Sequence, residues 1–408
     1  MELEEILMKK KTFRLIKIMA ILLTFVFITE CIYIFYMMHF QEEESLYFDG
    51  INALDSNSSY YVTVGSNNDN VNHFEKAKIS TYNRNKEKTF ERLYNVGYNS
   101  AFFGVALDKE DIIAVGSYEK TEEEHEKSIR RAFIVKYDKD GDMIFDSDFS
   151  LLENSKFTGV AVVEDGYFVT GQSIYPNTKI GSKEGGAILA KYDKEGNLLW
   201  SKHYGSNKAA IFNSLLVVDE FIYTVGTDEG HVGLLCKYDL EGNLLQYNDY
   251  KYTDDIGFSG IVEMDGFIYI SGSNRKVGSV TNAMIVKYDK DCTYIDQVTY
   301  ENKGTIRYNK LVKDNHNHLI AIGIIVTNKS SSYKTADSLH YDGLIGKYDE
   351  DLNEIRVVTY GEDRDDFFTD VRIENGEYLI VGYSSYEDGS YLSKFIRYSD
   401  ALKVLSVG

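Results

Sequence analysis

Residues 186–205 read GAILAKYDKEGNLLWSKHYG, and the centre of this stretch recurs at four other places in the chain. The copies are RAFIVKYDKDGDMIF from residue 131, GLLCKYDLEGNLLQY from 233, NAMIVKYDKDCTYID from 282 and DGLIGKYDEDLNEIR from 342. In each copy, an apolar run leads through KYD and a polar turn into a second run, which predicts a β-hairpin. Since one hairpin buries too little apolar surface to fold alone, the repetition predicts a structural unit stacked along the chain.

Two markers can be followed through the repeat region, and each occurs seven times. The spacing from each tyrosine marker to the next glycine marker is 34 residues, or 35 once, whereas the spacing from each glycine to its own tyrosine varies between 12 and 25. Nearly all length variation is therefore confined to one loop of each repeat. The glycines end β-rich runs and the tyrosines belong to KYD-like segments: Gly65, Gly116, Gly171, Gly226, Gly272, Gly323 and Gly382, and Tyr82, Tyr137, Tyr192, Tyr238, Tyr288, Tyr348 and Tyr398.

Each repeat divides into four predicted strands, which we name A to D in chain order. Strand B ends in the marker glycine, strand C ends in KYD, and strand D follows the turn after KYD. A small residue precedes each marker tyrosine by five positions, and in six repeats an aromatic residue follows it by twelve. Small residues facing large ones at fixed positions are typical of stacked, interdigitating sheets.

Seven four-stranded units in series are best accommodated by a radial array. The pattern therefore predicts an all-β, seven-bladed β-propeller of four-stranded antiparallel blades over residues 48–408. The repeats resemble bacterial propeller repeats of the KYDxxGNxLWxxxYG kind and are distantly similar to kelch repeats. This resemblance implies a fold but no particular function, because propellers serve as enzymes, adhesins and scaffolds alike. The tryptophan survives only as Trp200, and the seventh repeat has lost its glycine turn, which leaves open how tightly blade seven closes onto blade one.

The N-terminal region predicts one membrane-spanning helix. Residues 18–40 form an apolar run with a single charge, which is long enough to cross about 30 Å of hydrocarbon. A basic stretch precedes this run and should stay in the cytoplasm, so that the remainder of the chain lies outside. The expected organisation is a cytoplasmic tail 1–14, a signal-anchor helix 15–40, a linker 41–47 and the propeller 48–408.

Two alternatives to an uncleaved anchor are a cleaved signal peptide and a lipoprotein signal that uses Cys31. The apolar run is longer than a usual signal core and no small-x-small site follows it, while Glu30 is a poor match to the small residue that a lipoprotein signal needs before its cysteine. Within an anchor, Glu30 is either a contact for another membrane helix or a lone protonated carboxyl that a very apolar segment tolerates.

The composition excludes several classes of function. The formal net charge is −20, and such an acidic surface should repel nucleic acid, because binding phosphates needs clustered Lys and Arg. The three cysteines, Cys31, Cys236 and Cys292, show no CxxC or Cys/His spacing. We therefore expect neither a zinc site nor a disulfide framework, and no cofactor.

Two short motifs invite a metal interpretation. The alternating carboxylates of YDKDGD, from Asp138 to Asp142, suit calcium, but the other copies replace them and the downstream bidentate glutamate of an EF-hand is missing, which favours a hairpin turn. His316 and His318 lie two residues apart in DNHNHL, where the repeat predicts the tight turn between strands A and B. We interpret them as a chance pair on an exposed turn and expect no metal.

The sequence contains no GxSxG, HExxH, phosphate-binding glycine loop or paired catalytic carboxylate motif, so we name no catalytic residue. The alternative to a binding protein is an extracytoplasmic hydrolase or lyase that uses acids from several blades at the channel mouth. Two or three carboxylates within about 10 Å of each other there would favour this alternative. A plugged or apolar channel would oppose it.

In a four-stranded antiparallel blade, the B–C and D–A loops emerge on one face, the loop face, and the A–B and C–D turns emerge on the other, the turn face. Loops of varying length on a rigid scaffold are where recognition usually resides. Three of the B–C loops are long and chemically distinct: residues 117–131, 172–186 and 324–342. If strand A is innermost, the D–A loops add candidate ligand contacts near the channel mouth: Asp254, Asp255, Arg307, Asp365 and Asp366.

These observations predict a single-pass, membrane-anchored, extracytoplasmic propeller that binds a protein or a cell-envelope polymer without catalysis. The linker 41–47 spans at most about 25 Å when fully extended. Because the chain enters strand A from the loop face, that face should lie near the membrane. This geometry favours a membrane-proximal partner.

Overall fold

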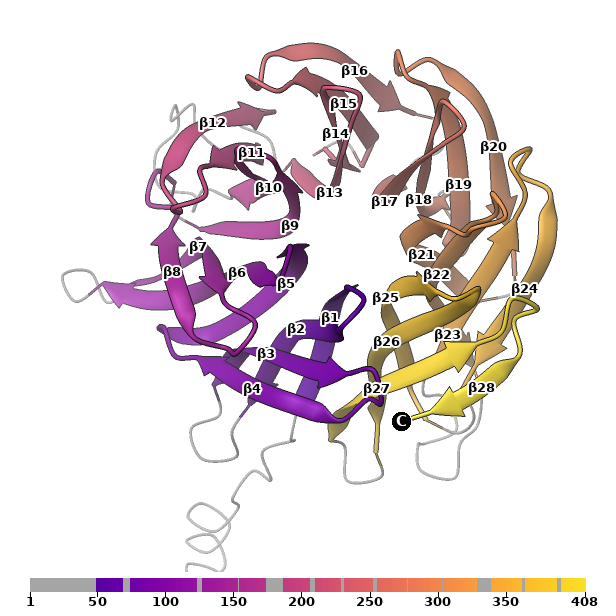
Figure 1. The fold of residues 1–408 in the computed structure, drawn as a ribbon. Coiled ribbons are helices and arrows are strands. Elements are labelled where there is room, and N and C mark those ends of the chain that lie inside the picture. The colour runs from indigo at the N-terminus through magenta and orange to yellow at the C-terminus, as the bar shows by residue number, and fades with distance from the viewer. Residues whose placement is uncertain are drawn as a thin grey trace, which may run out of the picture. The chain divides into compact units, whose positions relative to one another are not determined.

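The computed structural model describes residues 49–68, 74–122, 127–152, 154–173, 186–205, 210–228, 231–251, 255–276, 278–302, 304–328, 339–361, 364–386 and 390–408. In these residues, 28 strands form seven four-stranded antiparallel sheets around a central axis (Figure 1). The predicted all-β, seven-bladed propeller is therefore confirmed. The predicted tail, membrane helix and linker, together with Glu30, lie outside the described residues, and within those residues no helix has the length and apolarity to span a bilayer.

The strands of the blades have the following bounds. Blade one contains β1 (Asp49–Ser56), β2 (Tyr60–Asn68), β3 (Glu75–Asn83) and β4 (Lys88–Tyr94); blade two contains β5 (Tyr98–Asp108), β6 (Asp111–Glu122), β7 (Lys127–Tyr137) and β8 (Met143–Asp148). Blade three contains β9 (Ser155–Val163), β10 (Gly166–Ser173), β11 (Gly186–Tyr192) and β12 (Leu198–Tyr204); blade four contains β13 (Ile211–Val218), β14 (Phe221–Thr227), β15 (Gly233–Asp239) and β16 (Leu244–Tyr250). Blade five contains β17 (Asp255–Met264), β18 (Phe267–Arg275), β19 (Asn282–Asp289) and β20 (Tyr294–Tyr300); blade six contains β21 (Thr305–Lys313), β22 (Leu319–Asn328), β23 (Leu339–Tyr348) and β24 (Glu354–Tyr360). Blade seven contains β25 (Asp366–Glu374), β26 (Glu377–Ser385), β27 (Tyr391–Tyr398) and β28 (Val404–Val407).

Each blade is built from a single repeat, because the order of strands in every sheet follows the order in the chain. The first strand of each blade, the predicted strand A, is innermost, and each of these strands contacts the first strand of the neighbouring blade. Blade one (indigo) and blade seven (yellow) lie side by side, and each keeps its own four strands (Figure 1). The ring is therefore closed by side-chain contacts rather than by exchange of a strand.

The marker glycines are explained by a β-bulge in strand A. In blade four, Phe212 pairs with Gly226 and Ser214 with Val225, so Asn213 is an extra residue in β13. This bulge directs the carbonyl group of Ile211 against the Cα of Gly226, where the Cβ of any other residue would overlap with the oxygen. The six other blades have a bulge at the same place and the same contact at their marker glycine. Glycine is thus required by close backbone approach.

The aspartate of KYD closes the turn between strands C and D. In blade four, Asp239 Oδ1 accepts hydrogen bonds from the amides of Glu241 (3.1 Å) and Asn243 (2.7 Å). This is the backbone-mimicking role that Asp favours in turns. Asp138 Oδ1 accepts the amides of Asp140 and Asp142 in the same way, both at 2.9 Å, so YDKDGD forms the predicted hairpin turn.

The lysine of KYD connects neighbouring blades in three of the copies. Its ammonium group donates to a backbone carbonyl oxygen in the C–D turn of the following blade. The hydrogen bonds are Lys237 to Lys290 (2.7 Å), Lys287 to Glu350 (2.9 Å) and Lys347 to Asp400 (3.2 Å). The recurring triplet therefore has a structural role in these blades.

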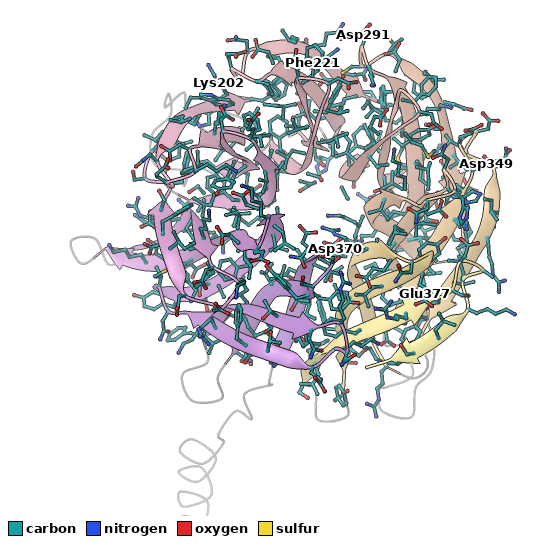
Figure 2. All side chains as sticks on the ribbon, viewed as in Figure 1. Lys202, Phe221, Asp291, Asp349, Asp370 and Glu377 are labelled. Carbon is teal, nitrogen blue, oxygen red and sulfur yellow. The ribbon has the colours of Figure 1, made fainter. Side chains whose placement is uncertain are left out.

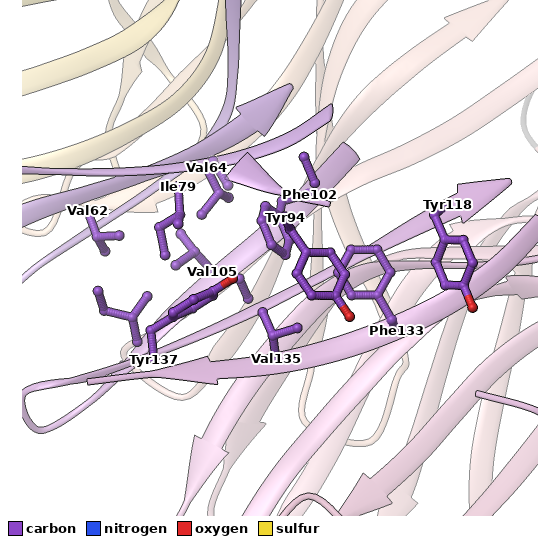
Figure 3. Close-up of a cluster of buried hydrophobic side chains, with 14 residues drawn as sticks. Val62, Val64, Ile79, Tyr94, Phe102, Val105, Tyr118, Phe133, Val135 and Tyr137 are labelled. Carbon is purple, nitrogen blue, oxygen red and sulfur yellow. The ribbon is translucent and has the colours of Figure 1, made fainter. Parts of the chain in front are cut away.

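The hydrophobic core is divided among the seams between blades. In the seam between blades one and two, Val62 and Ile79 pack against Phe102, Phe133 and Tyr137 (Figure 3). The corresponding cluster between blades seven and one is smaller and contains Ile51, Leu54, Tyr61, Leu379 and Val381. The two terminal blades are therefore packed together, although their shared core is less extensive.

One predicted loop is wrong. Residues 117–131, which the sequence predicts as a charged loop, mostly continue the ladder of β6 and β7 as far as the pair Glu122 and Lys127. The extension is stabilised by cross-strand contacts such as the ion pair between Arg130 and Glu119, whose nitrogen and oxygen atoms lie 2.9 Å apart. Opposite charges on facing strand positions favour such pairing, and blade two therefore has a longer hairpin than its neighbours.

Candidate functional site

A cavity of about 540 Å³ occupies the centre of the ring and is lined by the first strand of all seven blades. The bulge residues of these strands point to it, and five of them donate a hydrogen bond to the backbone carbonyl of the next blade. These five are Asn52 (2.8 Å to Phe102), Thr158 (2.6 Å to Phe212), Asn213 (2.7 Å to Phe258), Asn309 (3.2 Å to Phe368) and Thr369 (2.7 Å to Ile51). The polar ring of the channel thus holds neighbouring blades together.

Among the described residues that line this cavity, Asp370 is the only acid. It lies at the edge of the central opening (Figure 2) and is buried, accepting the amide of Leu54 at 3.0 Å, with Arg372 at 3.3 Å and Lys310 at 3.4 Å. Burial favours the neutral acid, but the two cations outweigh burial and lower the pKa of Asp370. Asp370 is therefore an anion at neutral pH, and the described lining provides no second carboxylate to pair with it.

The predicted ligand contacts do not gather at one place, and Asp254 lies outside the described residues. Asp255 begins β17, where its carboxylate pairs with Arg275 at 2.8 Å and approaches Nδ1 of His231 at 3.2 Å. Arg307 is exposed on β21. None of these residues lines the central cavity.

Asp365 and Asp366 are both buried, at 4% exposure each, at the start of blade seven. Asp366 accepts the hydroxyl of Ser384 and pairs with Lys394 at 3.2 Å. Burial raises the pKa of Asp366, while the Ser384 and Lys394 donors oppose this shift. A buried carboxylate with raised pKa costs stability, and such groups cluster at functional sites.

Two further groups at this seam were missed by the sequence analysis. His340 on β23 is completely buried, neither ring nitrogen has a hydrogen-bond partner among the described residues, and Nδ1 lies 3.7 Å from Asp365 Oδ1. The carboxylates of Asp342 and Asp366 both lie against the Cα of Gly361. The only available signal was that residues 340 and 342 fall in the predicted sixth B–C loop, 324–342, although the structure places both on β23.

Aromatic side chains cover the loop-face end of the same seam. We name Tyr341, Phe367, Tyr383 and Tyr391 the aromatic patch. Ring centroids are 4.9 Å apart for Tyr341 and Phe367, 4.8 Å for Phe367 and Tyr383, and 5.9 Å for Tyr383 and Tyr391. All four are only half-buried, and each lies at the loop-face end of its strand. Partly accessible tyrosines of this kind are enriched at protein interfaces, which makes the patch a candidate contact surface.

A second cavity, of about 660 Å³, lies on the turn face between blades seven and one. Two guanidinium groups converge there on Glu374: Arg84 at 2.5 Å and Arg397 at 2.9 Å, while the hydroxyl of Tyr61 donates to the same carboxylate at 2.7 Å. Burial favours protonated Glu374, but these three donors outweigh burial and lower its pKa. The arrangement links the first and last blades by charge.

A third cluster, also on the turn face, involves the histidine pair of blade six. Among the described residues, Asp314, His316 and His318 are the one group whose potential metal-ligating atoms all lie within 4.8 Å of one another. Burial alone would raise the pKa of Asp314, but amide donors from His318 and His316 and the Tyr378 hydroxyl lower it to about 2. The histidine pair therefore stands beside a permanent anion.

No protein-family model matches the chain, and no curated protein sequence matches it. Among solved structures, the chain is similar to a puromycin hydrolase (TM-score 0.55, 8% identity, 89% of this chain and 54% of that one) and to Pyrococcus horikoshii acylaminoacyl peptidase (TM-score 0.52, 7% identity, 90% and 53%). It is also similar to the Neurospora crassa Pan2 WD40 domain (TM-score 0.51, 7% identity, 84% and 88%). At such identities the likeness establishes the propeller fold alone, and the chain spans about half the length of the two hydrolases.

Proposed function

We propose that the chain is a non-catalytic binding module that holds a partner protein with a basic surface through the aromatic patch of blades six and seven. The observation that carries this proposal is the patch itself, in which four partly buried rings lie side by side at the seam that also contains the buried Asp365 and Asp366. Tyrosines are enriched among residues that dominate binding energy, because they bury large area with few rotatable bonds.

Charge complementarity favours a basic partner. The chain carries a net charge of −20, which speeds the encounter with a cationic surface and repels acidic ones. On the same loop face, the guanidinium of Arg364 lies 4.9 Å from the ring centroid of Tyr386, a ring outside the patch that already has a cation against it. A partner's Lys or Arg side chains would contact the rings, while the acidic net charge of the chain attracts them.

The alternative, a hydrolase or lyase in the channel, has less support. The described residues that line the cavity provide one carboxylate, Asp370, which is held by two cations. The similarity to two hydrolases extends over about half of each of those chains, so their activities are no guide to this one. A binding role also agrees with the extracytoplasmic anchoring that residues 15–40 predict.

The binding site can be tested with the full-length protein in detergent micelles and a fluorescent oligolysine peptide, measured by anisotropy. The double variant Phe367→Ala, Tyr383→Ala should bind the peptide at least about tenfold more weakly. Tyr247→Ala removes a 58% exposed tyrosine from β16 and serves as the matched control. Far-ultraviolet circular dichroism establishes that each variant is folded.

Two results would contradict the proposal. Equal peptide affinity in the double variant and the parent would show that the aromatic patch is not the binding site. Binding of a neutral or anionic envelope polysaccharide, without binding of the peptide, would show that the partner is a polymer and not a basic protein. Anchoring is tested separately: protease added to intact cells should degrade the region after residue 47 and spare residues 1–14. Protection of the propeller would reverse the predicted topology.

A further inference from the structure

The turn between strands A and B of blade six has a geometry that no other blade repeats. Asp314 Oδ1 accepts the amides of His316 (2.8 Å) and His318 (2.9 Å), which is the same capping arrangement as in the KYD turns. This cap holds both histidines on one short turn, with ring centroids 6.2 Å apart. The side chain of His316 is 61% exposed and that of His318 is 28% exposed, so both can be reached from solvent.

Spacing within the turn suits a metal ion. Nδ1 of His318 and Oδ2 of Asp314 lie 3.1 Å apart. Two ligand atoms bound at about 2.0–2.1 Å to a tetrahedral zinc ion are separated by about 3.3 Å. This carboxylate and this imidazole are therefore already close to ligand spacing.

The neighbouring blade adds a further oxygen. Asp400, in the C–D turn of blade seven, places Oδ1 at 3.9 Å from Nδ1 of His316. Sequence spacing gives no sign of this approach, because 84 residues separate the two positions. From these distances we propose that Asp314, His316 and His318, completed by Asp400, form a site for a divalent transition metal such as Zn²⁺ that connects blades six and seven.

Lys347 sets the affinity of this site. Its ammonium nitrogen lies 3.3 Å from Asp314 Oδ2 and 2.6 Å from Asp400 Oδ1, so without metal it neutralises both carboxylates. The hydroxyl of Tyr378 donates to the same two groups, at 2.9 Å and 2.8 Å. A metal ion must compete with this cation, because both require the same negative charge. Removing the lysine charge should therefore tighten metal binding, whereas a purely structural salt bridge predicts no such gain.

The test is a Zn²⁺ titration of the full-length protein by isothermal calorimetry, with Mg²⁺ as the hard-cation comparison. The parent should bind one Zn²⁺ per chain at this site and no Mg²⁺. His316→Ala should weaken Zn²⁺ binding at least about tenfold, and because this side chain is largely exposed the variant should fold. Lys347→Met should bind Zn²⁺ more tightly than the parent. His231→Ala, which removes a 69% exposed histidine from another turn, is the matched control.

The melting temperature gives a second measurement, which does not depend on the heat of binding that calorimetry records. Zn²⁺ should raise the melting temperature of the parent and of Lys347→Met, and raise that of His316→Ala by less, because an ion that binds only the folded state stabilises it in proportion to its affinity. Absence of stoichiometric Zn²⁺ binding by the parent overturns the site. Equal affinity in His316→Ala and the parent, or weaker affinity in Lys347→Met, overturns it as well.

Discussion

At the scale of single residues, glycines in similar sequence contexts are required for different reasons or not required at all. Gly272 is a marker glycine whose Cα faces the carbonyl of Gly257 across β17 and β18, and a Cβ there would overlap with backbone. Gly257 itself has room, since its nearest neighbours would be Thr227 Oγ1 at 3.5 Å and Ser273 Oγ at 3.9 Å. The first glycine is required by packing, and the second is not.

This difference predicts opposite outcomes for the same substitution. Gly272→Ala should lower the free energy of unfolding by more than about 2 kcal/mol, because backbone must move to admit the methyl group. Gly257→Ala should change it by less than about 1 kcal/mol, and a small gain is expected because alanine restricts the unfolded chain. Denaturant unfolding of the two variants provides the comparison, and equal costs would refute the bulge explanation.

Asp366 illustrates a residue retained at a cost. Burial raises its pKa, so the folded state holds the proton more tightly than the unfolded chain does. The favourable contribution of this group is fully present below the ordinary carboxylate pKa of about 3.9 and is lost as pH rises through the raised folded-state value. At neutral pH the buried carboxylate therefore reduces stability.

Asp366→Asn should accordingly be more stable than the parent at pH 7, by about 1 kcal/mol. The difference should shrink as pH falls toward about 4, where the parent's own carboxyl becomes protonated. Denaturant unfolding at several pH values measures both trends. A constant difference across this range would show that ionisation is not the cause. Weaker oligolysine binding by Asp366→Asn would show that the carboxylate charge of Asp366 contributes to binding a basic partner.

At the scale of strands, the sequence predicts what lies within a blade and misses much of what lies between blades. The constant 34-residue spacing identifies four strands per repeat because consecutive strands pair with each other through tight turns. The β6–β7 extension was missed because its alternating charges resemble a solvated loop, although Glu119 and Arg130 pair across the strands.

In the candidate sites, too, the sequence indicates residues within one blade and misses contacts between blades. Asp365 and Asp366 were predicted because the D–A loops must emerge at the loop face, whereas His340 was missed because its burial depends on the packing of blade six against blade seven. In the proposed metal site, His316 and His318 were noticed and interpreted as a chance pair. What changes the interpretation is Asp400, which approaches from another blade and has no sequence signature.

At the scale of the whole molecule, the ring is closed without a shared strand, so its weakest seam should be the one between the two termini. The shared core of blades seven and one is small, and charge supplements it. Glu374 is 8% exposed and receives Arg84, Arg397 and Tyr61, whereas Glu377, which is 41% exposed, pairs with Arg397 alone at 3.2 Å. The two glutamates thus share a partner but differ in burial.

Glu374→Gln should therefore lower the free energy of unfolding by about 1–3 kcal/mol, since it leaves Arg84 without its carboxylate and Arg397 with only the exposed Glu377. Glu377→Gln should cost less than about 0.5 kcal/mol, as exposed ion pairs usually do. Hydrogen exchange can locate the effect: protection should fall first in β1 and β25, because opening of the ring begins where no strand is exchanged. If Glu374→Gln instead loosens all seven blades equally, the ring unfolds as one cooperative unit and the terminal seam is not its point of opening.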